Sequence, residues 1–206
     1  MMNQTIENTT DVRKKAIIQG VVLGIISFIL SIISLYITVS ATSLFTSSAA
    51  AGFVNYVVFL IVAVFFVISL RKAAGGYWDF STALKNIFIM MAITAVIGTL
   101  GVSVWNMVNP TLQQEAIDNT INMTIETMEA TGANDENIDN TIEMLEQQRN
   151  ALAEMSIGQI LKGLAVSILM YFVLSLIFAA IFKRERPIFQ SPAPSGDAHP
   201  WQNEKS

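Results

Sequence analysis

The chain has no cysteine and a single histidine, and charged residues make up only 14% of its 206 residues. The absence of cysteine excludes a disulfide, a thiolate metal site and a cysteine nucleophile. His199 lies in a polar tail with no second metal ligand nearby, which argues against a metal-binding or general-base role. Because few routes to catalysis remain, we expect a protein that is not an enzyme and needs no cofactor.

Long apolar segments dominate the chain instead. They form four runs, at residues 16–38, 50–70, 86–108 and 160–182. At 1.5 Å per residue, a helix of about 20 residues crosses a hydrocarbon core about 30 Å thick. A membrane-spanning barrel would instead show alternating segments of about ten residues. The unbroken runs therefore predict an all-α, multi-pass membrane protein with four transmembrane helices.

The first run has an alternative interpretation as a signal peptide. The basic segment 13–15 precedes it, and Val39-Ser40-Ala41 resembles a small-residue cleavage site. The apolar part is longer than the usual core of a signal peptide, so we favour a transmembrane helix.

Charge is divided between the two sides of the predicted membrane domain. Ten of the twelve Lys and Arg residues lie before the first run, between the second and third, or after the fourth. Ten of the sixteen acidic residues lie between the third and fourth runs. By the positive-inside rule, both termini are predicted to be cytoplasmic, with the connections after the first and third runs on the opposite side.

Charged residues are nearly absent from the runs themselves. Lys162, close to the outer end of the fourth run, is the exception, and its long side chain is expected to reach the interface. Pumps and coupled transporters usually keep an ionisable residue at mid-membrane, and discontinuous transporter helices carry matching Gly and Pro interruptions. The sequence therefore argues against active transport but leaves a passive pathway open.

Small residues recur at helical spacing in the first and third runs. In the first run they are Gly20, Gly24, Ser27, Ser31, Ser34 and Thr38, and in the third Thr94, Gly98 and Gly101. Such residues let helix backbones approach closely in lipid, and their hydroxyls bond across the interface. We therefore predict that the first and third helices cross in contact along these residues. A homo-oligomer interface and a serine-lined pore are the alternatives.

The loop between the second and third runs reads as a turn followed by the start of a helix. Asp79 suits an N-cap. Tyr77, Trp78 and Phe80 suit the headgroup layer, so we place residues 77–80 at the membrane interface.

This loop also carries a resemblance to a known family. Gly76-Tyr77, a polar cap, an aromatic residue, and then Ala, a bulky apolar residue and Lys85 precede the third run. With the basic start, the four runs, the acidic third loop and the exit sequence 183–187, the chain resembles a bacterial membrane family, mostly from Bacteroidota, known as domain of unknown function 4199. The resemblance covers nearly the whole chain and implies an inner-membrane location with a periplasmic third loop. Members often carry Glu where this chain has Thr82, so no role of that acid is carried over.

The third loop, residues 109–159, is predicted to be an extracytoplasmic helical hairpin. Asn109 and Pro110 would open its first helix, which would end at Thr131-Gly132, and Asn134 or Asp135 would cap the second. The apolar stripes of the two helices are Ile117, Ile121, Ile125 and Met128, and Ile138, Ile142, Leu145 and Leu152. We expect the two stripes to bury each other.

Part of the second hairpin helix also matches a calcium-binding loop. The candidate ligands are Asp135, Asn137, Asp139, Thr141, Glu143 and Glu146. Position 6 of the loop is Asn140, where the turn requires Gly, and Ile138 belongs to the helical stripe. We therefore predict no metal site, because acids on a solvated face near a helix N-terminus explain the same residues.

We predict one membrane domain over residues 1–188 and a disordered cytoplasmic tail over residues 189–206. The expected partners are the lipid bilayer, a periplasmic or membrane protein and a second copy of the chain, but not nucleic acid. The first functional hypothesis is a non-enzymatic binding, sensing or scaffold protein that acts through its acidic hairpin. The alternative is a passive channel or a transport accessory subunit.

Overall fold

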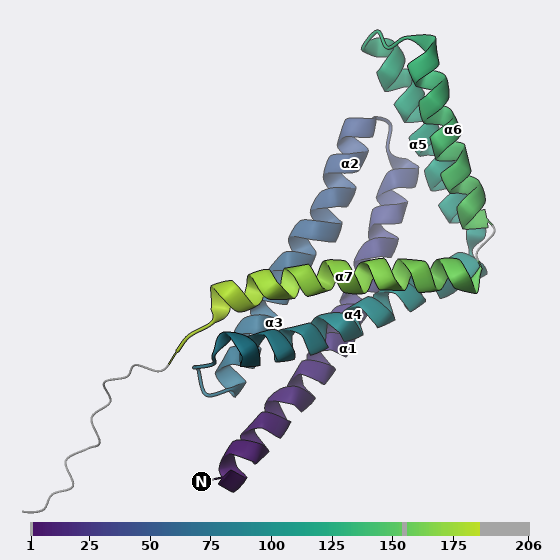
Figure 1. The fold of residues 1–206 in the computed structure, drawn as a ribbon. Coiled ribbons are helices and arrows are strands. Elements are labelled where there is room, and N and C mark those ends of the chain that lie inside the picture. Colours follow the sequence, from purple (N-terminus) through teal and green to yellow (C-terminus); the bar gives the residue numbers. More distant parts are fainter. Residues whose placement is uncertain (1, 154–155, 186–206) are drawn as a thin grey trace, which may run out of the picture.

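The computed structural model describes residues 2–153 and 156–185, so the predicted tail lies outside the described residues. Within these ranges the chain is helical and contains no β-strand. The elements are α1 (Met2–Ser40), α2 (Leu44–Gly52), the π-helix η1 (Phe53–Val58), α3 (Phe59–Ala73), α4 (Phe80–Val108), α5 (Pro110–Ala130), α6 (Asp135–Ala153) and α7 (Ile157–Phe182). The segments α2, η1 and α3 follow one another without a break and form a single long helix (Figure 1).

Four helical stretches are long and apolar enough to cross a membrane. They are Thr10–Ser40, Leu44–Ala73, Phe80–Val108 and Ile157–Phe182. Each contains one of the predicted runs and extends beyond it, because the helices continue into their polar ends. Large apolar side chains face outward, with Phe65 66% and Leu169 63% exposed, as expected for residues that contact lipid. The all-α, four-helix membrane prediction is confirmed.

The core of the bundle lies around α4. This helix crosses α1, and α7 packs along its other side (Figure 1). The largest fully buried apolar side chains are Leu23, Leu70, Ile87, Met90, Met91 and Val67, from α1, α3 and α4. Lipid tails are as apolar as these side chains, so close packing and hydrogen bonds must hold the helices together.

One end of the bundle carries the basic residues and is closed by the loop between α3 and α4. Trp78 and Arg184 exchange two backbone hydrogen bonds of 3.0 Å, and Trp78 Nε1 donates to the carbonyl oxygen of Phe182 at 2.9 Å. Trp78 is only 4% exposed. Trp78 is therefore covered by protein at this end of the bundle, where its indole N–H satisfies a carbonyl that α7 leaves unpaired at its end. Its place at the membrane interface stays a prediction.

The other three residues predicted to lie at the interface, Tyr77, Asp79 and Phe80, are at least partly exposed. Asp79 caps α4 through bonds from the backbone N–H groups of Ser81 at 3.1 Å and Thr82 at 3.3 Å. The Thr82 hydroxyl and these N–H groups lower the pKa of the Asp79 carboxyl. The Arg184 guanidinium lies 5.3 Å from the centre of the Tyr77 ring, and Phe80 is 39% exposed.

Candidate functional site

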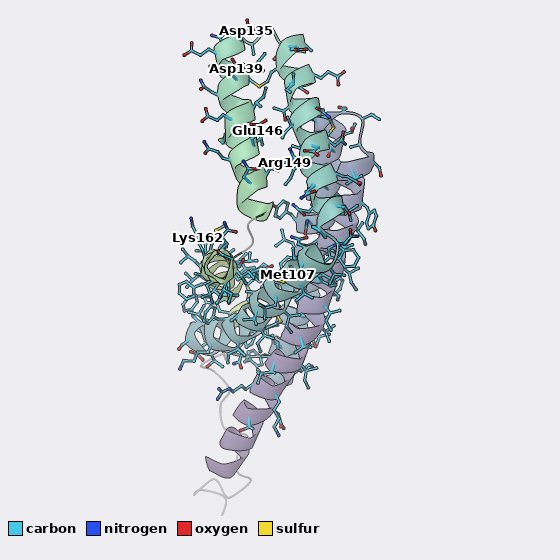
Figure 2. The ribbon with its side chains drawn as sticks, turned by 90° about the vertical axis from the view of Figure 1, so that its right-hand side faces the viewer. Met107, Asp135, Asp139, Glu146, Arg149 and Lys162 are labelled. Carbon is cyan, nitrogen blue, oxygen red and sulfur yellow. The ribbon has the colours of Figure 1, made fainter. Side chains whose placement is uncertain are left out.

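At the end of the bundle opposite the basic residues, α5 and α6 form a hairpin that projects beyond the spanning helices (Figure 2). Gly132 adopts a positive φ of 74°, which ends α5 and reverses the chain. Asn134 caps α6 by accepting a bond from the N–H of Asn137 at 3.1 Å. Asn109, predicted to cap α5, makes no such bond, because its Oδ1 accepts from the Thr111 hydroxyl at 2.9 Å.

The hairpin is anchored to α1 through a face of α5 that the sequence analysis missed. The Asn119 carboxamide donates to the carbonyl oxygens of Thr38 at 2.8 Å, Val39 at 3.2 Å and Ala41 at 2.9 Å, which lie at the end of α1. Helix ends leave carbonyl oxygens without intrahelical donors. The Thr38 carbonyl accepts only a long bond of 3.4 Å from the Ala41 N–H, so Asn119 supplies donors that the end of α1 lacks. The buried members of this face are Leu112, Ala116 and Met123. Leu112, Ala116, Asn119 and Met123 follow one another at spacings of four, three and four residues. This helical periodicity was the sequence signal that could have identified the face.

The predicted stripe on α5 lies on a different side and faces α6. The residues of this stripe, Ile117, Ile121, Ile125 and Met128, are half-buried, as are Ile138, Ile142 and Leu145 of α6. At the membrane end of the hairpin, Arg149 Nε and Asp118 Oδ1 form an ion pair of 3.3 Å. Both side chains are more than 40% exposed, so the ion pair adds little stability. Apolar packing between α5 and α6 therefore stabilises the hairpin more than this ion pair does.

The helix α6 contacts α5 and no other helix among the described residues. Its exposed acids are Asp135, Glu136, Asp139, Glu143 and Glu146. At 3.6 residues per turn they fall within an arc of roughly 100°, and Figure 2 shows three of them spread along the helix. The hairpin therefore presents a continuous acidic stripe, which we call the α6 stripe.

The α6 stripe does not form a calcium loop. Residues 135–146 are the first three turns of α6, because the helix begins at Asp135. On a helix, residues two apart such as Asp135 and Asn137 point to nearly opposite sides, so the candidate ligands do not converge. Among the described residues, no group of three or more acidic, His or Cys side chains is placed to hold a metal ion.

The predicted small-residue contact lies between α1 and α4. A Cβ added to Gly20 would lie 2.7 Å from the Met90 carbonyl oxygen, and one added to Gly24 would lie 2.7 Å from Ile97 Cβ. The Thr94 hydroxyl lies 3.2 Å from the Gly20 carbonyl oxygen and 2.9 Å from that of Met90. This face of α1 is thus covered by α4 of the same chain.

The remaining predicted packing residues have other neighbours. Gly98 faces Ser27, with a Cβ-to-Oγ distance of 3.5 Å, whereas Gly101 lies against the ring of Phe28. Ser34 donates to the Ala51 carbonyl oxygen of α2 at 3.2 Å. Ser31 donates to its own helix and lines a cavity described below. The small residues of α1 therefore serve two neighbouring helices and a cavity.

A polar cavity inside the bundle contains residues that the sequence analysis did not select. It lies among α1, η1, α4 and α7, and Asn55 and Asn106 line it. Asn55 belongs to η1, and single π-turns within a helix are frequent at functional sites. A carboxamide within an otherwise apolar run was the signal that could have identified both residues.

Comparison with known proteins gives a family but no described relative. No curated protein and no solved structure matches the chain. One family, described as protein of unknown function, matches over residues 19–184, which includes the hairpin, three spanning helices in full and most of the first. That range covers well over half of the chain, and the chain therefore belongs to the protein of unknown function family DUF4199.

Proposed function

We propose that the protein is a non-enzymatic binding protein of the bacterial inner membrane that acts through a periplasmic hairpin. Its four spanning helices support a multi-pass membrane protein. The orientation is inferred from charge. Arg149 and Lys162 are the only bases among the described residues near the hairpin end, whereas the opposite end carries Arg13, Arg71 and Arg184 with their basic neighbours.

The observation that carries the proposal is the α6 stripe. Asn119 fixes α5 to α1, so the hairpin is held firmly, while α6 leaves its acidic side free of contacts with other described helices. A surface of one charge sign attracts and orients an oppositely charged partner. We therefore propose that the stripe binds a basic segment of a periplasmic or membrane protein.

Crosslinking in living cells tests this function. A photoreactive amino acid at Asn140, which is exposed beside the stripe, should capture a partner. The test variant combines Asp139→Asn, Glu143→Gln and Glu146→Gln. The matched control on α5 combines Glu115→Gln, Glu126→Gln and Glu129→Gln. We expect the test variant to abolish capture and the control to retain it. Equal capture by both variants would contradict a role for the stripe.

A second candidate function, a passive channel or a transport accessory subunit, is favoured by the polar cavity. Hydroxyl and carboxamide groups line it within the membrane-spanning part. Release of a neutral solute such as glycerol from liposomes containing the purified protein would support this function. Liposomes with protein that are as tight as liposomes without it would rule out a channel.

A further inference from the structure

The polar cavity has a volume of about 390 Å³ and extends from the middle of the bundle towards the hairpin. On α4 its lining runs from Thr94 to Asn106, about 18 Å at 1.5 Å per residue. It lies beside the less buried part of α7. The buried residues of α7 are Ser175, Phe178 and Ala179, whereas the cavity borders the earlier turns between Gln159 and Tyr171.

The cavity wall offers hydrogen-bond acceptors and no charge. The hydroxyls of Ser31, Thr94 and Ser103 donate to carbonyl oxygens one turn earlier in their own helices, at 2.8 to 3.0 Å. Thr94 is fully buried, whereas Ser31 and Ser103 are partly exposed and have oxygen lone pairs left to accept bonds. Asn106 is only 8% exposed, and its Oδ1 is buried without a hydrogen-bond partner in the described part of the chain. A ligand that brings donors bonds to the exposed hydroxyl oxygens, and it satisfies this buried acceptor once the Asn106 carboxamide turns towards the cavity.

An apolar groove of about 580 Å³ continues the polar cavity. The two share Ser27, Asn55, Ser167 and Tyr171. Beyond these, the groove runs between α7 and the η1–α3 segment and is lined mainly by Phe59, Leu60, Val166, Met170, Leu174 and Ile177. Leu60, Met170 and Ile177 are also exposed, so the groove opens sideways towards lipid.

We propose that cavity and groove form one binding site for a membrane amphiphile with an uncharged, hydroxyl-bearing headgroup, such as a monoacylglycerol. The headgroup donates to Asn106 and the hydroxyl oxygens, and the hydrocarbon chain lies in the groove. None of the described residues that line either cavity is charged, so an anionic headgroup would be buried without a counter-charge. Each volume lies in the range of about 300–1,000 Å³ typical of ligand sites. This inference does not depend on the partner of the hairpin.

The test uses the full chain in phosphatidylcholine nanodiscs. Alkyl maltosides are avoided, because they belong to the proposed ligand class. The probe is 1-monooleoylglycerol, and its binding is followed by the rise in unfolding temperature that a ligand of the native state produces. Two comparison compounds test what the headgroup and the hydrocarbon chain of the probe each contribute to binding. The compound 1-oleoylglycerol 3-phosphate has the same chain with an anionic headgroup, and free glycerol has the headgroup alone.

Two glycines of α7 provide a matched pair of variants. Gly163 stands between Gln159 and Ser167 on the face that lines the cavity, and a Cβ there meets no atom within 4 Å. Gly163→Leu therefore has room for its Cβ and extends a side chain on the face that lines the cavity. Gly158 lines neither cavity, and its Cβ would meet only Ser156 Oγ at 3.7 Å. Gly158→Leu is the control, because it makes the same side-chain change on the same helix outside both cavities.

We expect 1-monooleoylglycerol to raise the unfolding temperature of the wild type and Gly158→Leu in a saturable manner, and to have no effect on Gly163→Leu. Asn106→Leu should raise the half-saturating concentration about fivefold to tenfold, the effect of losing one buried hydrogen bond. The two comparison compounds should have no effect. No response of the wild type, an undiminished response of Gly163→Leu, or an equal response to either comparison compound would overturn the proposal.

Discussion

Two Gly→Ala substitutions in the contact between α1 and α4 are expected to change the free energy of unfolding in opposite directions. At Gly20 a new Cβ would lie 2.7 Å from the Met90 carbonyl oxygen and 2.9 Å from Ile93 Cβ. Ordinary contact begins at 3.4 Å, so the helices must separate by about 0.7 Å (3.4 minus 2.7) at this point. At Gly98 the nearest atom is Ser27 Oγ at 3.5 Å, and no separation is needed.

The expected magnitudes follow from three terms. Alanine is favoured over glycine within a helix by about 1 kcal/mol, and this term stabilises both variants. Overpacking at Gly20 costs about 1–3 kcal/mol. Separation also weakens the bond of the Thr94 hydroxyl to the Gly20 carbonyl oxygen, a loss of about 0.5–1.5 kcal/mol. We therefore expect Gly20→Ala to lower the free energy of unfolding by about 0.5–3.5 kcal/mol and Gly98→Ala to raise it by about 1 kcal/mol.

Reversible unfolding in mixed micelles, followed by tryptophan fluorescence, measures both variants against the wild type. Gly24→Ala is a second test, because its Cβ would lie 2.7 Å from Ile97 Cβ, the same distance as the shortest contact at Gly20. The reasoning is refuted if Gly20→Ala and Gly24→Ala are as stable as Gly98→Ala.

Three further predictions concern the hairpin. Alkaline phosphatase fused after Gly132 should be active in bacterial cells and one fused after residue 185 inactive; the reverse pattern would invert the proposed orientation. Asn119→Ala should lower the free energy of unfolding by about 1–3 kcal/mol and speed hydrogen exchange at the end of α1, because the carbonyls of Val39 and Ala41 lose their donor and that of Thr38 loses the shorter of its two bonds. The control Asn122→Ala, at an exposed site of the same helix, should change neither quantity. Calcium titration should show no tight one-to-one site, and tight binding that is lost in Glu146→Gln would show that the stripe does hold a metal ion.

The features that were predicted from the sequence depend on residues close to one another in the chain. Lipid imposes an apolar composition on every stretch of about 20 residues that crosses it, so the four helices were evident from composition alone. Small residues at helical spacing indicated which surfaces come close, and α1 meets α4 at Gly20 and Gly24. The turn at Gly132 and the cap at Asn134 depend on a few neighbouring residues, and both are read directly from the chain.

The remaining features depend on atoms far away in the sequence. The local pattern around Trp78 does not show that it is buried, because the carbonyl that accepts its indole N–H belongs to Phe182, 104 residues later. Asn119 looks like any polar residue of a solvated helix until the end of α1 is placed beside it. The cavity near Asn106 lies among α1, η1, α4 and α7, which are distant in the sequence, so no local pattern records it.

The π-helix η1 sets the rotational phase between the two halves of its long helix. At roughly 100° per residue, an unbroken α-helix would place Ala51 about 115° and Ser47 about 155° from the centre of the buried stripe of α3. That stripe consists of Phe59, Ala63, Val67 and Leu70. One extra residue in the wide turn reduces these angles to roughly 15° and 55°, which brings Ala51 to Ser34 of α1 and buries Ser47. Deleting one residue from 53–58 would therefore rotate α2 towards lipid, so the segment should tolerate substitution far better than a change in length.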